Sequence, residues 1–219
     1  MSVLLSRELE RIKRSLLALC ALVEEQVSNA VRALLERDEE LANAVERRDQ
    51  DVDQREIEIE EECLKTLALH QPVAVDLRLI VASLKINNDL ERIGDLAVNI
   101  TKKARALALM PAFTVPFDLA GMSEKAQSML HDSLDALVNL DAELAKDVCS
   151  RDDAVDAMKR EIRLGAEELI RQNPDDTPPL MRVIAIARNL ERIADCATNI
   201  AEDVIYMTEG AIVRHHESA

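Results

Sequence analysis

The chain has almost no aromatic residues and very little glycine. Its 219 residues include no Trp, one Tyr, two Phe and only four Gly. β-Sheets favour aromatic and β-branched residues, whereas Leu, Ala, Glu and Arg, which suit helices, dominate this sequence. Hydrophobic residues still make up 48% of the chain, which argues against a disordered protein. The composition therefore predicts an all-α protein with an apolar core.

Cysteine is also scarce, and its spacing carries no signature. Cys20, Cys63, Cys149 and Cys196 form no Cys-x-x-Cys pair, so we predict neither a disulfide framework nor a zinc knuckle and expect reduced thiols in the cytoplasm. No apolar run approaches the roughly 20 residues of a membrane span. Residues 11–23 imitate a signal peptide, but the helical pattern continues beyond them, so we interpret them as part of a core helix.

Positive charge is in deficit. Lys and Arg total 27 whereas Asp and Glu total 42, which gives a formal net charge of −15. Such a chain is expected to avoid nucleic acid and anionic membranes and to attract cations or basic protein surfaces. Solubility alone would also explain this charge, and on charge alone it is the simpler interpretation.

Proline is confined to three short segments, which divide the chain into long helical patterns. These segments contain Pro72, then Pro111 and Pro116, and then Pro174, Pro178 and Pro179. Apolar residues that recur every three or four positions predict the helices between them. The predicted helices span residues 3–36, 38–70, 75–108, 119–139, 141–172 and 180–209.

The second half of the chain repeats the first. RDQDVD at 48–53 matches RDDAVD at 151–156, and LERIGDLAVNI at 90–100 matches LERIADCATNI at 190–200. A repeat of this length indicates a duplicated unit, here of three antiparallel helices. We therefore predict two tandem pseudo-symmetric three-helix bundles. The predicted boundaries are 1–109 for the first bundle, 110–118 for a linker, 119–209 for the second bundle and 210–219 for a flexible tail.

Each half keeps pairs of acidic residues four positions apart, away from the apolar seam of the helix. In the third and sixth helices the pairs are Glu91 and Asp95, and Glu191 and Asp195. In the second and fifth helices they are Asp49 and Asp53, and Asp152 and Asp156. Like charges at this spacing cost a helix about 0.2–0.5 kcal/mol, so helix stability does not explain them.

If the helices of a half are neighbours, these pairs face each other across a groove. A hard or borderline cation would relieve their repulsion, since carboxylate oxygens suit such metals. A plain solvated face, or neutralisation by Arg92 and Arg192, is the alternative. We expect Arg48 and Arg151 to form ion pairs with the carboxylates. No Glu-x-x-His metal motif, phosphate loop or catalytic triad pattern occurs, so an enzyme is not predicted.

These repeated motifs resemble the PhoU family, and the resemblance covers nearly the whole chain. It is carried by RRDQDVD, SRDDAVD, DLRLIVASLKINNDLERIGDLAVNI and RVIAIARNLERIADCATNIAEDV. The resemblance implies surface metal clusters, which hold iron or zinc in some members of the family, and the carboxylate oxygens would also suit manganese or magnesium. The implied ligands are Asp49, Asp53, Glu91, Asp95, Asp152, Asp156, Glu191 and Asp195, with Glu202 as an addition. Lys102 occupies the place that matches Glu202, so we expect the second half to have the richer oxygen set.

The resemblance also implies a cytoplasmic adaptor without catalysis of its own. Such a protein restrains the phosphate ABC transporter and the phosphate-sensing histidine kinase when phosphate is plentiful. The expected partners are the transporter ATPase subunit, the kinase and a second copy of the chain, and it would reach membrane complexes only through these partners. The alternatives are a metal-storage or metal-dependent phosphohydrolase bundle, and a metal-free helical scaffold.

Overall fold

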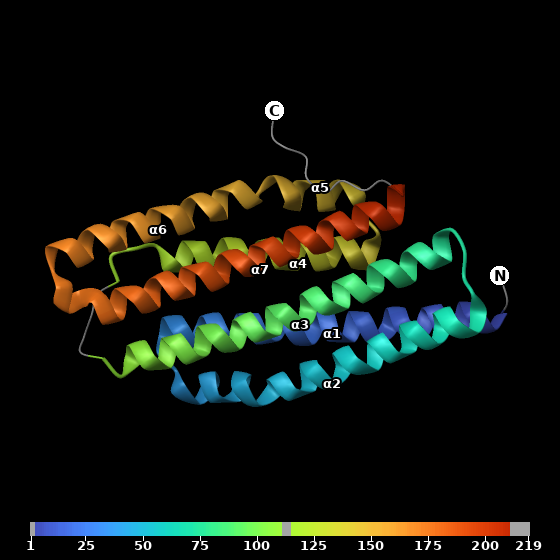
Figure 1. Cartoon of the computed structure of the whole chain (residues 1–219), viewed down its shortest axis with the longest axis horizontal. Helices are drawn as coiled ribbons and strands as arrows, with labels where there is room; N and C mark the ends of the chain where they lie inside the picture. Colours follow the sequence, from blue (N-terminus) through green and yellow to red (C-terminus); the bar gives the residue numbers. More distant parts are fainter. Residues whose placement is uncertain (1–2, 111–114, 211–219) are drawn as a thin grey trace.

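The computed structural model describes residues 3–110 and 115–210, and in this part of the chain every regular element is a helix (Figure 1). The all-α prediction is therefore confirmed. Four residues of the predicted linker, 111–114, and residues 211–219 of the predicted tail lie outside the described residues. The helices are α1 Val3–Glu36, α2 Glu39–His70, α3 Val75–Ala108, α4 Leu119–Asn139, α5 Ala142–Ser150, α6 Asp152–Gln172 and α7 Thr177–Glu209, with a 3₁₀ turn η1 at Pro174–Asp176.

The predicted helix at 141–172 is divided into α5 and α6 at Arg151. There the backbone N–H groups of Arg151 and Ala154 bond to carbonyls three residues back rather than four. The hydroxyl of Ser150 donates to the carbonyl of Asp147 at 2.7 Å, a side-chain bond that bends helices. The residue that matches Ser150 in the first half is Arg47, and α2 continues through Arg47 without a break.

The connections α1–α2 and α4–α5 have the same local structure. Arg37 and Leu140 both adopt positive φ, 56° and 52°, which ends the preceding helix in a left-handed cap. The next residues, Asp38 and Asp141, accept backbone N–H groups three residues on, at 2.9 and 3.1 Å, and so begin the following helices. The repeat seen in the sequence thus extends to the turns.

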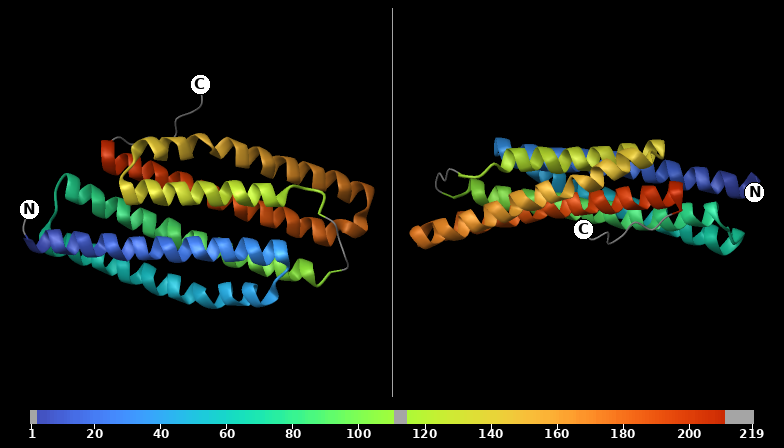
Figure 2. Two further views of the ribbon diagram at one scale, coloured as in Figure 1. Left: turned by 180° about the vertical axis from the view of Figure 1, so that it is seen from behind. Right: turned by 90° about the horizontal axis from the view of Figure 1, so that it is seen from above.

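The two halves share one apolar core. α1 and α2 pack on α3, while α4, α5 and α6 pack on α7. α3 and α7 have the most extensive contact of any helix pair, and α1 also touches α4 (Figure 2). Outside the core, His131 on α4 lies 2.6 Å from Glu24 on α1. The central pair α3 and α7 carries the repeated LERIxD motif of each half.

None of the described helices combines the length and the apolar character that crossing a membrane requires.

Candidate metal centre

The four acidic residues predicted in the first half come together where α2 lies against α3. Asp49 and Asp53 lie on α2, and Glu91 and Asp95 lie on α3. Gly94 permits the close approach of the two helices, because a Cβ atom there would lie 3.2 Å from Cγ1 of Val52 and 3.3 Å from Oδ1 of Asp49. The absence of a side chain at Gly94 therefore leaves room for Val52 and Asp49 of α2 against α3.

The charges of this cluster act on one another. Burial, and then repulsion from Asp53 and Asp95, raises the pKa of Asp49 above its usual range. Burial followed by repulsion from Asp95 and Asp53 likewise raises the pKa of Glu91. The buried amide of Gln26 donates to Oδ1 of Asp49 at 3.0 Å and opposes part of this shift. Such mutual repulsion is what carboxylates on two packed helices exert on one another.

Glu56 on α2 is a fifth carboxylate of this cluster, and it was missed from the sequence. Its repulsion contributes to the raised pKa of Glu91. Its own pKa is raised by burial and by repulsion from Glu60 and Asp53. The amide of Asn87 donates to the backbone carbonyl of Glu56 at 2.9 Å, which ties α3 to α2 at this point. We refer to Asp49, Asp53, Glu56, Glu91 and Asp95 as the first-half cluster.

The second half gathers its four predicted residues in the same way. Asp152 and Asp156 lie on α6, and Glu191 and Asp195 lie on α7. Burial and repulsion from Asp156 raise the pKa of Asp152. Burial, followed by repulsion from Glu191, Asp152 and Asp156, raises the pKa of Asp195 to about 6. We refer to these four residues as the second-half cluster.

Lys159 distinguishes the second-half cluster from the first. Its Nζ donates to Oδ1 of Asp156 at 2.7 Å and to Oε1 of Glu191 at 2.6 Å, so its ammonium group holds α6 and α7 together. Lys159 matches Glu56 when the second half is aligned on the first with the offset of 103 residues. That alignment could have identified both residues.

At a second pair of matching positions the lysine lies in the first half, as Lys102, and the carboxylate lies in the second half, as Glu202. Lys102, on α3, attracts the carboxylate of Asp49. Glu202, at the matching position of α7, lies near Cys149, whose pKa is raised by burial and by repulsion from Glu202 and Asp152. Each half therefore has five carboxylates and one lysine at matching positions. The expectation of a richer oxygen set in the second half is wrong, because Lys159 offsets the gain of Glu202.

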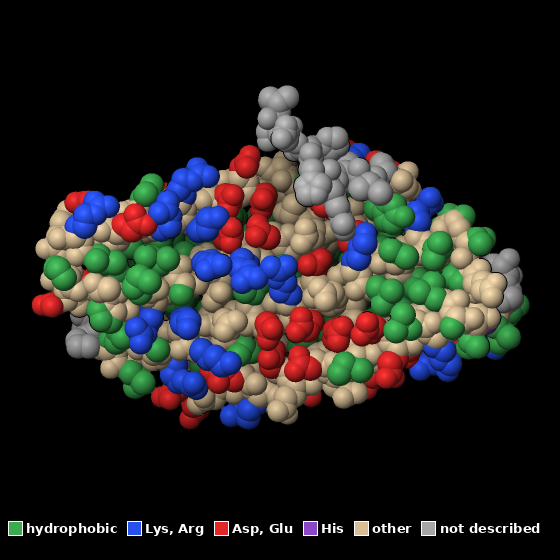
Figure 3. Space-filling model, viewed as in Figure 1, with side chains coloured by type: hydrophobic (Ala, Val, Ile, Leu, Met, Phe, Trp, Pro, Cys, Tyr) green, Lys and Arg blue, Asp and Glu red, His purple; other side chains and the backbone are tan. Residues whose placement is uncertain are grey.

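Arg48 and Arg151 were expected to form ion pairs with the cluster carboxylates, but each pairs with a carboxylate outside the clusters. Arg48 pairs with Glu25 at 2.6 Å, and Arg151 pairs with Asp132 at 2.7 Å. Among the described residues, neither Arg92 nor Arg192 forms an ion pair with a cluster carboxylate. In the space-filling view a band of Lys and Arg separates two groups of Asp and Glu (Figure 3).

The first-half cluster fits a hard cation by its chemistry. In residues 3–110 and 115–210, none of its carboxylates is in an ion pair with Lys or Arg, and the buried Oε1 of Gln26 accepts no hydrogen bond. The same residues contain no group of three or more His, Cys, Asp or Glu side chains arranged to hold a metal ion. The oxygen donors are therefore present on the two helices but are not gathered around one point.

The chain is similar to known proteins over nearly its whole length. The PhoU domain family model matches residues 16–104 and 119–204. A protein from Pseudomonas putida, named phosphate-specific transport system accessory protein PhoU homolog, is 41% identical over 95% of this chain and 82% of its own length. A protein of the same name from Aquifex aeolicus is 38% identical over 96% of each chain.

Two solved structures have the same fold. The crystal structure of PhoU from Pseudomonas aeruginosa superposes with a TM-score of 0.90 at 37% identity, covering 94% of this chain and 99% of that one. The phosphate transport system regulatory protein PhoU from Streptococcus pneumoniae superposes with a TM-score of 0.85 at 30% identity, covering 95% and 99%.

Proposed function

We propose, because the chain belongs to the PhoU family, that it is a cytoplasmic accessory protein that restrains phosphate uptake when phosphate is plentiful. Its similarity to accessory proteins of the phosphate-specific transport system, along nearly its whole length, supports this role. We propose that it acts by binding partners and has no catalysis of its own. The two clusters of carboxylates on neighbouring helices carry the proposal, because their mutual repulsion offers a site for a cation or for a basic partner surface.

The proposal assigns metal binding to these clusters. In the first half, Asp49, Asp53, Glu91 and Asp95 would hold iron, zinc, manganese or magnesium, with Glu56 beside them. A bound cation would neutralise the repulsion that now raises the pKa of Asp49 and Glu91. In the second half the ammonium of Lys159 already lies between Asp156 and Glu191, so metal there would have to displace it. We therefore expect the first-half cluster to bind metal more tightly.

The proposed partners are the transporter ATPase subunit and the phosphate-sensing histidine kinase. A second copy of the chain is also proposed, and an apolar end of the molecule supports a protein contact. Large apolar side chains lie exposed at the start of α1, the end of α2 and the start of α3, and Figure 3 shows such side chains gathered at one end of the molecule. They are Val3, Leu4, Leu69, Val73, Val75 and Leu77.

A reporter in cells tests the regulatory role. The host lacks its own homologue and carries a reporter of the phosphate-starvation response. We expect this host to express the reporter even in phosphate-rich medium. Introducing this chain should silence the reporter, and purified chain should retain the transporter ATPase subunit and the kinase cytoplasmic domain in a pull-down. A reporter that stays active, together with no retention of either partner, would refute the proposed function.

Sedimentation of the purified chain tests the homodimer. We expect a dimer that Leu69→Glu converts to a monomer, because a charge in an apolar contact is costly. The matched variant Leu164→Glu replaces an exposed leucine on α6, away from the apolar end, and should leave the dimer intact. A wild-type monomer at all concentrations would remove this part of the proposal.

A further inference from the structure

A hollow of about 320 Å³ lies between the C-terminal part of α3 and the N-terminal part of α7. It adjoins the first-half cluster through Lys102, which attracts Asp49, but none of the cluster carboxylates lines it. Three cationic side chains and three uncharged ones line it, and no carboxylate does. The lining residues are Lys102, Lys103, Ala106, Met181, Arg182 and Ala185.

The three cations have little to neutralise them. In the described part of the chain, neither lysine forms an ion pair, and Arg182 donates only to the backbone carbonyl of Pro178, at 3.0 Å. Lys102 also attracts Asp49, which belongs to the first-half cluster. In a chain with a formal charge of −15, three positive groups around one hollow are a local reversal of the overall charge.

The repeat provides an internal comparison, because α3 and α7 match at an offset of 100 residues. The place that matches this hollow lies at the opposite end of the α3–α7 contact, and there it is filled. Nζ of Lys85 lies 5.3 Å from the centre of the Tyr206 ring and 3.0 Å from Oδ1 of Asp203. The residues that match Lys85 and Tyr206 are Ala185 and Ala106. The hollow thus exists where two small residues replace the stacked pair.

The charges also differ between the hollow and the filled end of the α3–α7 contact. Lys102 and Lys103 at the hollow match Glu202 and Asp203 at the filled end. At the filled end a lysine and an aspartate neutralise each other within the protein. At the hollow both the filling side chains and the neutralising carboxylates are replaced, which leaves space and positive charge together.

We propose that this hollow is a binding site for a phosphate group. A phosphate group carries up to two negative charges and several acceptor oxygens, which suits two lysine ammonium groups and the planar donor fork of an arginine. None of the residues that line the hollow is a proposed metal ligand. The ligand is a small phosphate anion or the head group of an anionic lipid, since both present the same chemistry.

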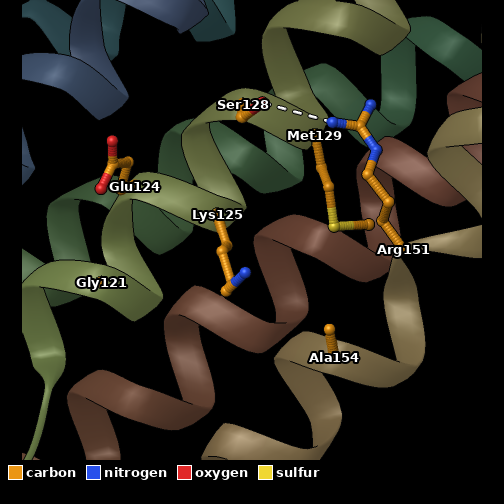
Figure 4. Close-up of a pocket in the computed structure, with 7 residues that line it drawn as sticks. All are labelled: Gly121, Glu124, Lys125, Ser128, Met129, Arg151 and Ala154. Atoms are coloured by element: carbon orange, nitrogen blue, oxygen red, sulfur yellow. Dashed lines mark hydrogen bonds between the residues drawn. The ribbon is translucent and has the colours of Figure 1, made fainter.

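A second hollow, of about 350 Å³, also has cationic side chains, but one of them is already paired within the protein. It lies between α4 and the start of α6, and Lys125 and Arg151 line it together with Glu124 (Figure 4). There Arg151 is already held by Ser128 at 3.3 Å and by Asp132 at 2.7 Å. Its positive charge is largely satisfied within the protein, so this hollow does not favour an anion as the first one does.

Calorimetric titration of the purified chain with inorganic phosphate and with pyrophosphate tests the site. The variant Lys102→Glu/Lys103→Asp gives the hollow the charges of the filled end. We expect it to weaken binding by at least about tenfold, because it replaces two attractive charges by two repulsive ones. The matched variant Lys65→Glu/Arg160→Asp makes the same change in net charge on exposed parts of α2 and α6 and should leave binding unchanged.

Ala106→Tyr tests the space independently of the charge. It introduces the ring that Tyr206 contributes at the filled end and retains all three cations, so weaker binding with unchanged charge would support a shaped site. Circular dichroism and the thermal midpoint of each variant check that it is folded. Equal losses in the Lys102→Glu/Lys103→Asp variant and its matched control would mean attraction by overall charge only and would overturn the proposal.

Co-sedimentation with phosphatidylcholine vesicles, with and without phosphatidylglycerol, separates the two sources of the phosphate group. Binding to soluble anions that depends on Lys102 and Lys103 identifies a phosphate-anion site. Binding that requires phosphatidylglycerol and the same lysines, without binding of soluble anions, identifies a lipid head-group site. Binding of neither, or binding that survives Lys102→Glu/Lys103→Asp, overturns the proposal.

Discussion

Single lysines set the strength of the repulsion in each cluster. In the second half, Lys159 lies between Asp156 and Glu191 at hydrogen-bonding distance. In the first half, Glu56 stands at the matching position and adds repulsion to Glu91. One position of the repeat therefore decides whether a cluster is neutralised from within or leaves its charge for another cation.

Replacing Lys159 by Met should destabilise the metal-free protein, because it leaves the two carboxylates unpaired. The side chains of Lys159 and Asp156 are about one-third exposed, so we expect a loss of about 1 kcal/mol rather than the larger cost of a buried pair. Urea unfolding in the presence of a chelator measures it. Lys146→Met, which removes more exposed pairs with Glu143 and Glu209, is the control and should change stability little.

The acidity of Asp195 predicts a dependence of stability on pH. Its pKa is about 6 in the folded protein and about 3.9 in an unfolded chain. The folded state therefore binds the proton of Asp195 more tightly than the unfolded state does. The resulting contribution to the free energy of unfolding is fully present below about pH 4 and is lost as the pH rises through 6. Asp195→Asn should then stabilise the chelator-treated protein at pH 7.5 by about 1 kcal/mol, discounted for solvent exposure.

Thermal unfolding at pH 7.5 and at pH 4 measures this effect. The gain from Asp195→Asn should vanish at the lower pH, where the wild-type carboxyl is protonated. Asp175→Asn, on the exposed η1 turn, is the matched control and should show no such difference. An equal gain at both pH values would contradict a pKa raised by the cluster.

At the scale of elements, the ends of the helices are defined by a few residues that recur in both halves. A left-handed residue followed by Asp ends α1 and begins α2, and the same arrangement separates α4 from α5. Neither left-handed position is Gly, so each stores some backbone strain. The break at Arg151 has no counterpart in α2, since Ser150 is replaced there by Arg47.

Arg37→Gly should stabilise the protein by about 0.5–1 kcal/mol, because glycine adopts the left-handed conformation at φ 56° without strain. Arg47→Gly is the matched control, since it removes a similarly exposed arginine inside α2. It should cost about 1 kcal/mol through lost helix propensity. Urea unfolding of both variants measures the difference, and a loss of stability in Arg37→Gly would contradict this role of the cap.

At the scale of the whole molecule, the two halves form one core rather than two separate bundles. Buried residues of both halves belong to a single apolar cluster, and α3 and α7 lie at its centre. This arrangement places the carboxylate clusters on either side of the α3–α7 pair. It also forms the cationic hollow at one end of that pair.

A shared core predicts that damage to either half unfolds both. Ile86 on α3 and Ile186 on α7 occupy matching positions and are fully buried. Truncation of either to Ala should cost about 2–5 kcal/mol and leave a single cooperative transition in urea. Circular dichroism follows the unfolding, and two separate transitions in either variant would indicate halves that fold independently.

The helices, the repeat and the facing acidic pairs could be predicted because each follows from a local or repeated pattern. The period of three and four residues fixes the helices, and the off-seam spacing fixes the side on which the acidic pairs lie. The ion pairs of Arg48 and Arg151 could not be predicted in this way. Both arginines lie beside acidic motifs in the sequence but reach Glu25 and Asp132 on the neighbouring helix, which depends on the packing of helices.

The pairing of α3 with α7 could not be predicted either. Both helices carry apolar seams, but a seam does not specify which helix covers it. The cationic hollow depends on this pairing, because Lys102 and Lys103 come from α3 and Arg182 from α7. Lys159 and Glu56 were within reach of the sequence, since the offset of 103 residues aligns them, but their roles required the positions of the carboxylates.

Metal content by elemental mass spectrometry tests the central claim most directly. Tag-free protein from metal-replete cells is compared with Asp53→Asn/Glu91→Gln in the first-half cluster. Asp51→Asn/Glu61→Gln is the control, since it makes the same change in charge on exposed parts of α2. We predict stoichiometric iron, zinc, manganese or magnesium in the wild type and control, and loss of the metal that the first-half cluster holds in the cluster variant. No metal in the wild type, or equal metal in both variants, would contradict the assignment of the carboxylate clusters to metal binding.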